Sequence, residues 1–420
     1  MKQKYSFREV IYDWNQVDSV HQLDKRRVSL LDETLRDGIQ ATYVRDPEAN
    51  EKLDLLRLMD GLGIEFADVG LPAASPRTAR HSEMLVRGIA DEGMKIKPSM
   101  AARTLRQDIE PIVEIVQKTG VAVEVMAFIG SSPIRMISED WDIDFLVKRS
   151  IEAIDFAKRE GLKVTFVTED TTRSRPEVLY KLISSAVDHG ADRVCIADTT
   201  GHATPDGIRA LMKFVFNLLT GLGVSVGVDW HGHNDRGLAM GNALWALQWG
   251  ADRVHATALG VGERAGNTNM EQLIANLRLL EAIGPERDLT HLIEYCDLAS
   301  KYLEHQIPPN SPLAGNAVFK TATGVHAAAT LKARKKGEEY LADRVYSGVP
   351  AAIFGKQQKV VIGPMSGKAN CVYLLQDMGI EPLPEVVEAL LKLAKESNHI
   401  LTTAEVMAVV RDHGSGPSQS

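Results

Sequence analysis

The chain has 420 residues, 44% of them hydrophobic and 25% charged, which is the balance of a globular protein with room for a barrel-sized domain and a smaller second one. Its net charge of -8 is spread without a basic stripe, so we expect no nucleic-acid partner. No apolar segment approaches the ~18 residues of a membrane-spanning helix and no signal-type core follows the N-terminus, which predicts a cytoplasmic protein without a membrane partner.

The N-terminal segment and the cysteines show little patterning. Residues 1–27 are polar with scattered aromatic side chains, which suggests an N-terminal arm laid across a surface. The three cysteines, Cys195, Cys296 and Cys371, are far apart and lack the spacing of a disulfide frame or a zinc knuckle. We expect them to be free, buried thiols in a reducing compartment.

From Val28 onward, short apolar runs alternate with longer segments of helical periodicity. Capping residues stand before proline at several expected helix starts, as at Ser75-Pro76 and Thr204-Pro205, and glycines follow many of the helical segments. The eight candidate strands cover residues 28–31, 65–69, 95–100, 121–127, 163–167, 193–197, 224–230 and 253–258.

Eight strand-helix units within roughly 250 residues match the α/β architecture of a (β/α)₈ TIM barrel in length and count. An open doubly wound sheet is the alternative, but no glycine-rich G-x-G-x-x-G turn follows the first strand. We therefore predict a TIM barrel over residues 28–284.

The alternation of strands and helices stops near Gly284-Pro285. Residues 285–330 read as a linker and helical subdomain, broken by the proline-rich run 307–312, and residues 331–410 as a small, mainly helical C-terminal subdomain. Residues 411–420, which are rich in glycine and serine, predict a disordered tail.

The run Asp229-Trp230-His231-Gly232-His233-Asn234-Asp235 follows the seventh candidate strand. In an extended segment, side chains two residues apart lie on the same face, so His231 and His233 are placed to hold one metal ion. The alternative is one structural histidine in the core and one exposed on the loop.

Other expected strands also end in polar residues. The carboxyl ends of barrel strands meet at one mouth, so these side chains are expected to be neighbours, although each alone could serve as a cap or in an ion pair. A carboxylate, two imidazoles and an amide would suit Mg²⁺, Mn²⁺, Co²⁺ or Zn²⁺. Besides the histidines, the groups are 32–38, Arg103, 168–170, 198–201 and 262–267.

Three motifs in this order resemble those of the DRE-TIM metallolyase superfamily. They are D-E-T-L-R-D-G at 32–38, H-G-H-N-D at 231–235 and G-V-G-E-R-A-G-N at 260–267. Within the superfamily, the chain is most similar to the Claisen-condensing synthases, 2-isopropylmalate synthase and homocitrate synthase. The likeness runs from about residue 28 to residue 367, and the run 70–76 together with 263–268 resembles the isopropylmalate branch more than the homocitrate branch.

The resemblance implies roles for individual residues and a homodimer. The histidine that His326 matches enters the active site from the second domain of the partner subunit in that family. The implied metal ligands are Asp37, His231, His233 and Asn267; the implied catalytic residues are Arg36, Glu169, His326 and Tyr346; and the implied substrate-binding residues are Arg103, Thr199 and Gln40.

The implied reaction condenses acetyl-CoA with a 2-oxo acid and then hydrolyses the thioester, giving a 2-alkylmalate in amino-acid biosynthesis. A divalent metal (Mg, Mn, Zn or Co) would polarise the 2-oxo group. The first choice of acceptor is a branched apolar acid such as 2-oxoisovalerate. Arg103 could instead bind a distal carboxylate, so 2-oxoglutarate, pyruvate, oxaloacetate and specialised 2-oxo acids remain open, as do homocitrate and citramalate synthase activities.

Some features depart from the family pattern. Met365 stands where the family loop usually has histidine. The basic run 334–336 is expected to be a solvated charged segment, with a contact to CoA phosphates as the alternative. The chain ends before the leucine-binding regulatory domain of many isopropylmalate synthases, so we expect no leucine feedback through such a domain.

Two other functions are alternatives to the synthase. A carbon-carbon lyase of the hydroxymethylglutaryl-CoA type should have a cysteine in the glycine-rich loop after the eighth strand, where this chain has Glu263 and Arg264. A non-catalytic relative should have lost at least one of the residues implied for catalysis or metal binding, and none is missing.

Overall fold

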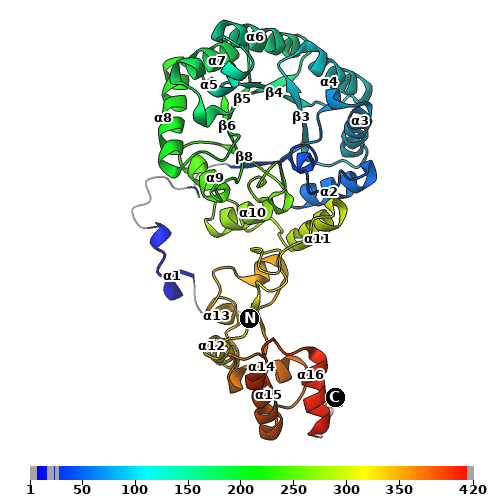
Figure 1. The fold of residues 1–420 in the computed structure, drawn as a ribbon, viewed down its shortest axis with the longest axis vertical. Coiled ribbons are helices and arrows are strands. Elements are labelled where there is room, and N and C mark those ends of the chain that lie inside the picture. Colours follow the sequence, from blue (N-terminus) through cyan, green and yellow to red (C-terminus); the bar gives the residue numbers. More distant parts are fainter. Residues whose placement is uncertain (1–6, 17–22, 24–27, 414–420) are drawn as a thin grey trace. The chain divides into compact units, whose positions relative to one another are not determined.

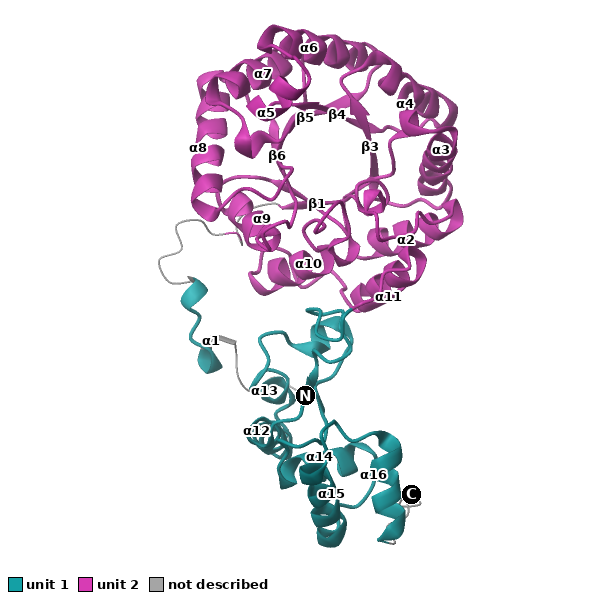
Figure 2. Ribbon diagram, in the orientation of Figure 1, with its two compact units in different colours: residues 1–18, 308–420 teal, residues 19–307 magenta. Residues whose placement is uncertain are grey.

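The computed structural model describes residues 7–16, 23 and 28–413 of the chain. By their internal contacts, the residues form two compact units, one of residues 19–307 and one of residues 1–18 with 308–420 (Figure 2). Residues 1–6, 17–22 and 24–27 of the expected N-terminal arm and residues 414–420 of the expected tail lie outside the described residues. The tail prediction was wrong for residues 411 and 412, which belong to the last helix of the chain.

The larger unit is built on a closed barrel of parallel strands in sequence order (Figure 1), which confirms the predicted TIM barrel. The barrel closes where β1 pairs with β8, with Leu31 opposite His255 and Asp32 opposite Ala256. The strands are β1 (Ser29–Asp32), β2 (Phe66–Asp68), β3 (Lys97–Arg103), β4 (Glu124–Gly130), β5 (Lys163–Glu169), β6 (Arg193–Asp198), β7 (Gly227–Gly232) and β8 (Arg253–Ala256).

Several strands are shifted toward the C-terminus relative to the predicted runs. β3 ends at Arg103 and β4 at Gly130, because Arg103 pairs with Phe128 and Gly130 pairs with Glu169 on the next strand. An apolar run shows which residues are buried. A strand, however, extends as far as its backbone can form hydrogen bonds with the neighbouring strand.

Helices surround the strands in the ring that Figure 1 shows. Local signals set their starts: Ser75 accepts from the Thr78 amide to cap α3, and Thr204 accepts from the Gly207 amide to cap α8. The helices are α2 (Ala49–Gly61), α3 (Pro76–Asp91), α4 (Arg106–Thr119), α5 (Pro133–Ser138), α6 (Ile143–Arg159), α7 (Pro176–Asp188), α8 (Pro205–Gly221), α9 (Ala239–Gln248), α10 (Met270–Leu279) and α11 (Leu292–Leu303).

The division between the units falls later than the residue 284 boundary that the sequence suggests. Helix α11 packs against α2 and the loop after β8, and Tyr295 on α11 donates a hydrogen bond to buried Asp32 at 2.5 Å. Apolar and polar contacts together therefore hold α11 to the barrel, and the larger unit runs to residue 307.

The smaller unit is mainly helical, as predicted. Its core is formed by apolar side chains of the last three helices and the preceding loop, among them Ile362, Leu375, Leu390 and Val406. Its elements are α1 (Phe7–Val10), β9 (Lys320–Thr321), α12 (Gly324–Lys335), α13 (Glu339–Ala342), β10 (Lys359–Val360), α14 (Lys368–Asp377), α15 (Pro384–Glu396) and α16 (Thr403–Asp412).

The barrel interior contains charged as well as apolar residues. Arg253, the first residue of β8, is fully buried and donates to Glu124 at 2.5 Å and to Asp229 at 2.8 Å. The three cysteines are buried and free, as expected. Among the described helices, none has both the length and the apolarity to span a membrane.

Candidate active site at the barrel mouth

Three candidate metal ligands meet at the carboxyl ends of the strands. Asp37 lies in the loop after β1, His231 is near the end of β7, and His233 follows it, bridged to Asn267 in the loop after β8. The nearest oxygen of Asp37 is 3.9 Å from Nε2 of His231 and 3.6 Å from Nε2 of His233. All three residues are buried, so residues up to 196 positions apart form one polar cluster.

The donor set fits a divalent cation. One carboxylate and two imidazoles each offer a ligand atom, and these atoms all lie within 4.8 Å of one another. Burial alone would raise the pKa of Asp37, but nearby Arg36 and His231 lower it, so the carboxylate is ionised. Burial next to His231 lowers the pKa of His233 to about 4, which keeps its imidazole neutral. Both are the forms in which these side chains bind metals.

Asn267 contacts the cluster through its amide nitrogen, which donates to Asp37 at 2.6 Å. Its Oδ1 is buried and has no hydrogen-bond partner among the described residues. In this orientation Asn267 holds the carboxylate, and a direct oxygen contact with a cation would require the opposite orientation of the amide.

Arg36 lies beside the cluster and is surrounded by acidic side chains. Its guanidinium donates to Asp68 at 2.7 Å, to Asp37 at 2.8 Å and to Glu33 at 2.9 Å. Burial raises the pKa of Asp68 to about 6 even though Arg36 opposes the shift. Sequence reasoning missed Asp68, because it ends an apolar strand and only its place in the barrel brings it to Arg36.

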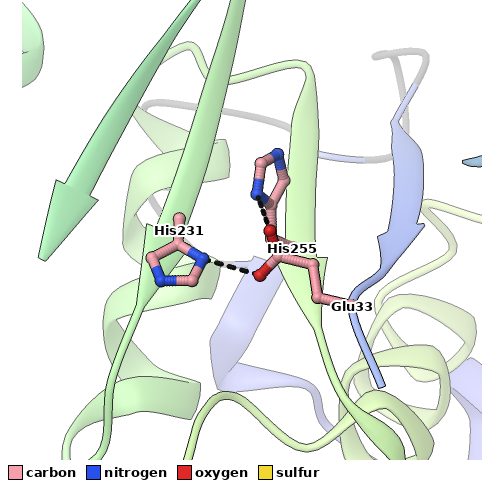
Figure 3. A group of neighbouring side chains, drawn as sticks. All are labelled: Glu33, His231 and His255. Atoms are coloured by element: carbon pink, nitrogen blue, oxygen red, sulfur yellow. Dashed lines mark hydrogen bonds and ion pairs between the residues drawn. The ribbon is translucent and has the colours of Figure 1, made fainter. Parts of the chain in front are cut away.

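Glu33 links the cluster to the barrel interior. One carboxylate oxygen accepts from Nδ1 of His231 at 2.7 Å and the other from Nδ1 of His255 at 3.0 Å (Figure 3). His255 in turn contacts Asp229 through Nε2 at 3.0 Å. Sequence reasoning did not single out Glu33, His255 or Asp229, although Asp229 lies two residues before His231 and so on the same face of β7.

Glu169 and Thr199 stand at the ends of β5 and β6. Glu169 has a side chain that is 31% exposed, and burial raises its pKa although Arg135 opposes the shift. The hydroxyl oxygen of Thr199 accepts from the Asp170 amide at 2.8 Å, which leaves its hydrogen free to donate. Both groups are chemically suited to the roles that the sequence suggested.

Arg103 and Gln40 differ in how firmly they are held. Two guanidinium nitrogens of Arg103 bind the buried carboxylate of Asp108, at 2.6 and 2.9 Å, while the side chain stays 56% exposed. Gln40 is exposed at the end of a short 3₁₀ turn, Gly38–Gln40.

The remaining predicted residues belong to the smaller unit. His326 is in the first turn of α12 and stacks on Tyr346, with ring centroids 3.8 Å apart. The loop with Met365 adjoins the start of this helix, because the Gly324 amide donates to the Met365 carbonyl at 3.2 Å. Arg334 of the basic run lies over the ring of Tyr373 at 4.6 Å, so this residue is packed rather than freely solvated.

Comparisons with known proteins show which family the chain resembles. Residues 27–299 match the HMGL-like protein family. The homocitrate synthase AksA of Methanocaldococcus jannaschii is 33% identical over 376 residues, which cover 89% of this chain and 87% of that protein. The probable 2-isopropylmalate synthase of Ignicoccus hospitalis is 32% identical over 368 residues, which cover 86% of this chain and 85% of that protein.

A solved structure shares the fold. The hydroxymethylglutaryl-CoA lyase from Pseudomonas aeruginosa superposes with a TM-score of 0.57 at 20% identity, covering 70% of this chain and 97% of that one. At this identity, the likeness concerns the barrel architecture alone.

Proposed function

The chain belongs to the HMGL-like family and to the Claisen-condensing branch of the DRE-TIM metallolyases, and from this premise we propose a divalent-metal-dependent acyltransferase that condenses acetyl-CoA with a 2-oxo acid. The product would be a 2-alkylmalate, released after hydrolysis of the thioester. The observation that carries the proposal is the meeting of Asp37, His231 and His233 at the barrel mouth.

The ligand cluster and Arg36 support the condensation step. Asp37, His231 and His233 would hold a divalent cation, which would supply Lewis-acid polarisation of a 2-oxo group. The guanidinium of Arg36 lies directly against the ligand Asp37, where a fixed positive charge stabilises negative charge that develops on an oxygen.

Glu169, Thr199 and His326 take the remaining roles in the proposal. The free hydroxyl hydrogen of Thr199 would bind the carboxylate of the 2-oxo acid. Glu169 and His326 would move protons, since the methyl group of a thioester is a weak acid and its deprotonation needs a base with a pKa near neutrality. Tyr346, stacked on His326, would share its site.

The preferred acceptor is an apolar branched 2-oxo acid such as 2-oxoisovalerate. Arg103, the residue suited to a distal carboxylate, already has two of its nitrogens on Asp108, so a second carboxylate would have to compete with this pair. 2-Oxoglutarate is the second candidate, because a relative covering most of the chain is named a homocitrate synthase.

We further propose that the active protein is a homodimer in which His326 and Tyr346 of one subunit complete the barrel site of the other. Both residues lie in the smaller unit, which has its own apolar core, whereas the metal-ligand cluster lies wholly in the barrel. The family resemblance supports an exchange of this kind between subunits.

The test is release of free thiol from acetyl-CoA by metal-reconstituted protein across a panel of 2-oxo acids. We expect release with one acceptor, and its loss in His231→Ala, because this change removes a ligand of the metal. Folded, metal-loaded protein that releases no thiol with any acceptor would contradict the acetyl-CoA reaction.

A further inference from the structure

Glu33 accepts hydrogen bonds from three different side chains of the site. It is completely buried. Its carboxylate accepts hydrogen bonds from Nδ1 of His231, Nδ1 of His255 and the guanidinium of Arg36, at 2.7 to 3.0 Å. One oxygen of Glu33 accepts from the Arg36 guanidinium, which can only donate, and from Nδ1 of His255, while the other oxygen faces Nδ1 of His231. This geometry makes Glu33 the acceptor in all three hydrogen bonds.

This contact determines which ring nitrogen of His231 is free. Since Glu33 is the acceptor, Nδ1 of His231 must carry a hydrogen, and a neutral imidazole then has its lone pair on Nε2. Nε2 is the atom that faces Asp37, at 3.9 Å. The equivalent nitrogen of His233, Nδ1, is buried without a hydrogen-bond partner among the described residues, so His233 lacks this support.

Glu33 is itself held in place by residues of the barrel interior. Its second oxygen is held by His255, whose other ring nitrogen contacts Asp229, and Asp229 is bound by Arg253 at 2.8 Å and by Arg193 at 2.6 Å. These groups come from β6, β7 and β8 and are mostly buried, so the carboxylate has little freedom to rotate away from His231.

We propose that Glu33 is a positioning residue of the metal site, which holds His231 in the tautomer that presents Nε2 to a divalent cation. The inference rests on the proposed metal ligands, but it concerns binding of the metal and is tested without substrate. A carboxylate behind a ligating imidazole orients the ring and makes it more basic, and losing such support commonly lowers metal affinity roughly 10- to 100-fold.

The informative variant is Glu33→Gln, which keeps the size of the side chain. An amide has one acceptor oxygen and one donor nitrogen. If the oxygen faces His231, the nitrogen meets the hydrogens of His255 and Arg36; if the nitrogen faces His231, it demands the tautomer in which Nε2 is protonated. Either orientation disturbs the arrangement that the native carboxylate satisfies.

Asp32→Asn is the matched control. Asp32 is the preceding residue and is equally buried, but it bonds to Tyr295 and the Thr34 amide and touches none of the metal ligands. Both variants replace a buried carboxylate of the same segment by its amide. A loss of affinity caused by general loosening of the barrel should therefore appear in both.

Affinity for Zn²⁺ is measured by competition with a chromophoric chelator, on protein shown to be folded by circular dichroism. We expect a loss of roughly 10- to 100-fold in Glu33→Gln and little change in Asp32→Asn. Unchanged affinity in folded Glu33→Gln, or equal losses in both variants, would overturn the proposal. If the parent protein binds Zn²⁺ but releases no thiol, the proposed function fails and the role of Glu33 does not.

A second measurement uses the native protein and does not depend on whether a variant folds. In a crystal structure of the Zn²⁺-loaded protein, His231 should bind the ion through Nε2 while Nδ1 stays on Glu33. Coordination through Nδ1, or a Glu33 carboxylate turned onto the ion, would refute the positioning role.

Discussion

Charge at the barrel mouth is unevenly balanced around Arg36. Its single guanidinium contacts the carboxyl groups of Glu33, Asp37 and Asp68, all buried. Glu33 has a second cationic neighbour in His255, whose pKa its partners raise to about 9 against the effect of burial. Where acidic groups outnumber cations in a buried site, a bound divalent cation offsets the excess. The residues thus favour the proposed metal on electrostatic grounds as well as by ligand type.

Glu169 is the residue at which a catalytic role is most directly testable. If it transfers a proton in the reaction, Glu169→Gln should lower kcat roughly 10²- to 10⁴-fold, with a smaller effect on KM. Burial raises the pKa of Glu169, so its proton is lost at higher pH than from an ordinary glutamic acid. In the pH dependence of kcat/KM, the transition caused by Glu169 should therefore lie at a higher pH than that of an ordinary glutamic acid. This transition should disappear in Glu169→Gln.

Glu139→Gln is the control for this experiment. Glu139 binds the same Arg135, at 3.1 Å. It lies directly after the short helix α5 and not on a barrel strand. Activity of Glu139→Gln should stay close to that of the parent protein. Retention of kcat and of this pH transition in Glu169→Gln would exclude Glu169 from proton transfer.

The candidate ligands were predictable from sequence because each has a local signal. His231 and His233 share a strand face by spacing, and Asp37 follows an apolar strand within a familiar motif. Glu33 lies in the same motif and Asp229 in the same run as the histidines, but nothing local shows which side chains they contact. Glu33 meets His231 across 198 residues and His255 across 222, contacts that depend on β1 closing the barrel against β8. Which acidic residue supports which ligand is therefore a property of the closed barrel.

At the scale of elements, the loops after β6, β7 and β8 hold one another in place. Arg264 donates to Asp235 at 2.7 Å and to the Thr199 carbonyl at 2.5 Å. The Asn234 amide donates to the Gly266 carbonyl, and the Asn267 amide to the Gly260 carbonyl. These bonds fix the position of Asn267 beside Asp37, so the loop after β8 is part of the framework of the site.

Gly266 is a position at which this framework should be sensitive to substitution. Its φ is +86°, and an added Cβ would lie 2.0 Å from the Gly260 carbonyl oxygen. Gly266→Ala should lower the free energy of unfolding by about 2–4 kcal/mol through backbone strain and overlap, and weaken metal binding by displacing Asn267. Denaturant unfolding and chelator competition measure the two effects.

Gly237→Ala is the control that separates backbone strain from steric overlap of the added methyl group. Its φ is +70°, but an added Cβ would meet nothing within 4 Å. The expected loss is about 1 kcal/mol, with metal affinity preserved. Equal destabilisation by the two alanines would mean that the contact with the Gly260 carbonyl contributes nothing.

The order of the elements was predictable, and their limits were less so. Eight apolar runs separated by capped helices predicted the barrel, because hydrophobic periodicity and helix-capping residues can be recognised within a short stretch of sequence. Helix α11 was assigned beyond the barrel because the strand-helix rhythm ends before it, yet Tyr295 binds Asp32 of β1 across 263 residues. A boundary between compact units depends on such distant contacts, which have no counterpart in local periodicity.

At the scale of the whole molecule, the proposed site draws on two separate compact units. The metal-ligand cluster, Arg36, Glu169 and Thr199 belong to the barrel, and His326 with Tyr346 belongs to the smaller unit. Gly324 and Gly367 fit closely at the start of α12, where a Cβ on Gly324 would lie 2.9 Å from the Gly367 nitrogen. The loop with Met365 thus helps to position the His326 helix even though it lacks the histidine usual in the family.

Mixing two inactive variants tests whether the barrel of one subunit works with His326 of the other. Glu169→Gln and His326→Ala should each be inactive as homodimers. After co-expression, random pairing makes half of the dimers mixed, and each mixed dimer has one site with an intact barrel and an intact His326, so about a quarter of the parent activity should return. Sites built within one subunit would regain nothing, because every chain then has one of the two defects. Sedimentation checks that dimers form, and purification through a different affinity tag on each variant isolates the mixed dimers. If these mixed dimers regain no activity, the exchange of His326 between subunits is contradicted.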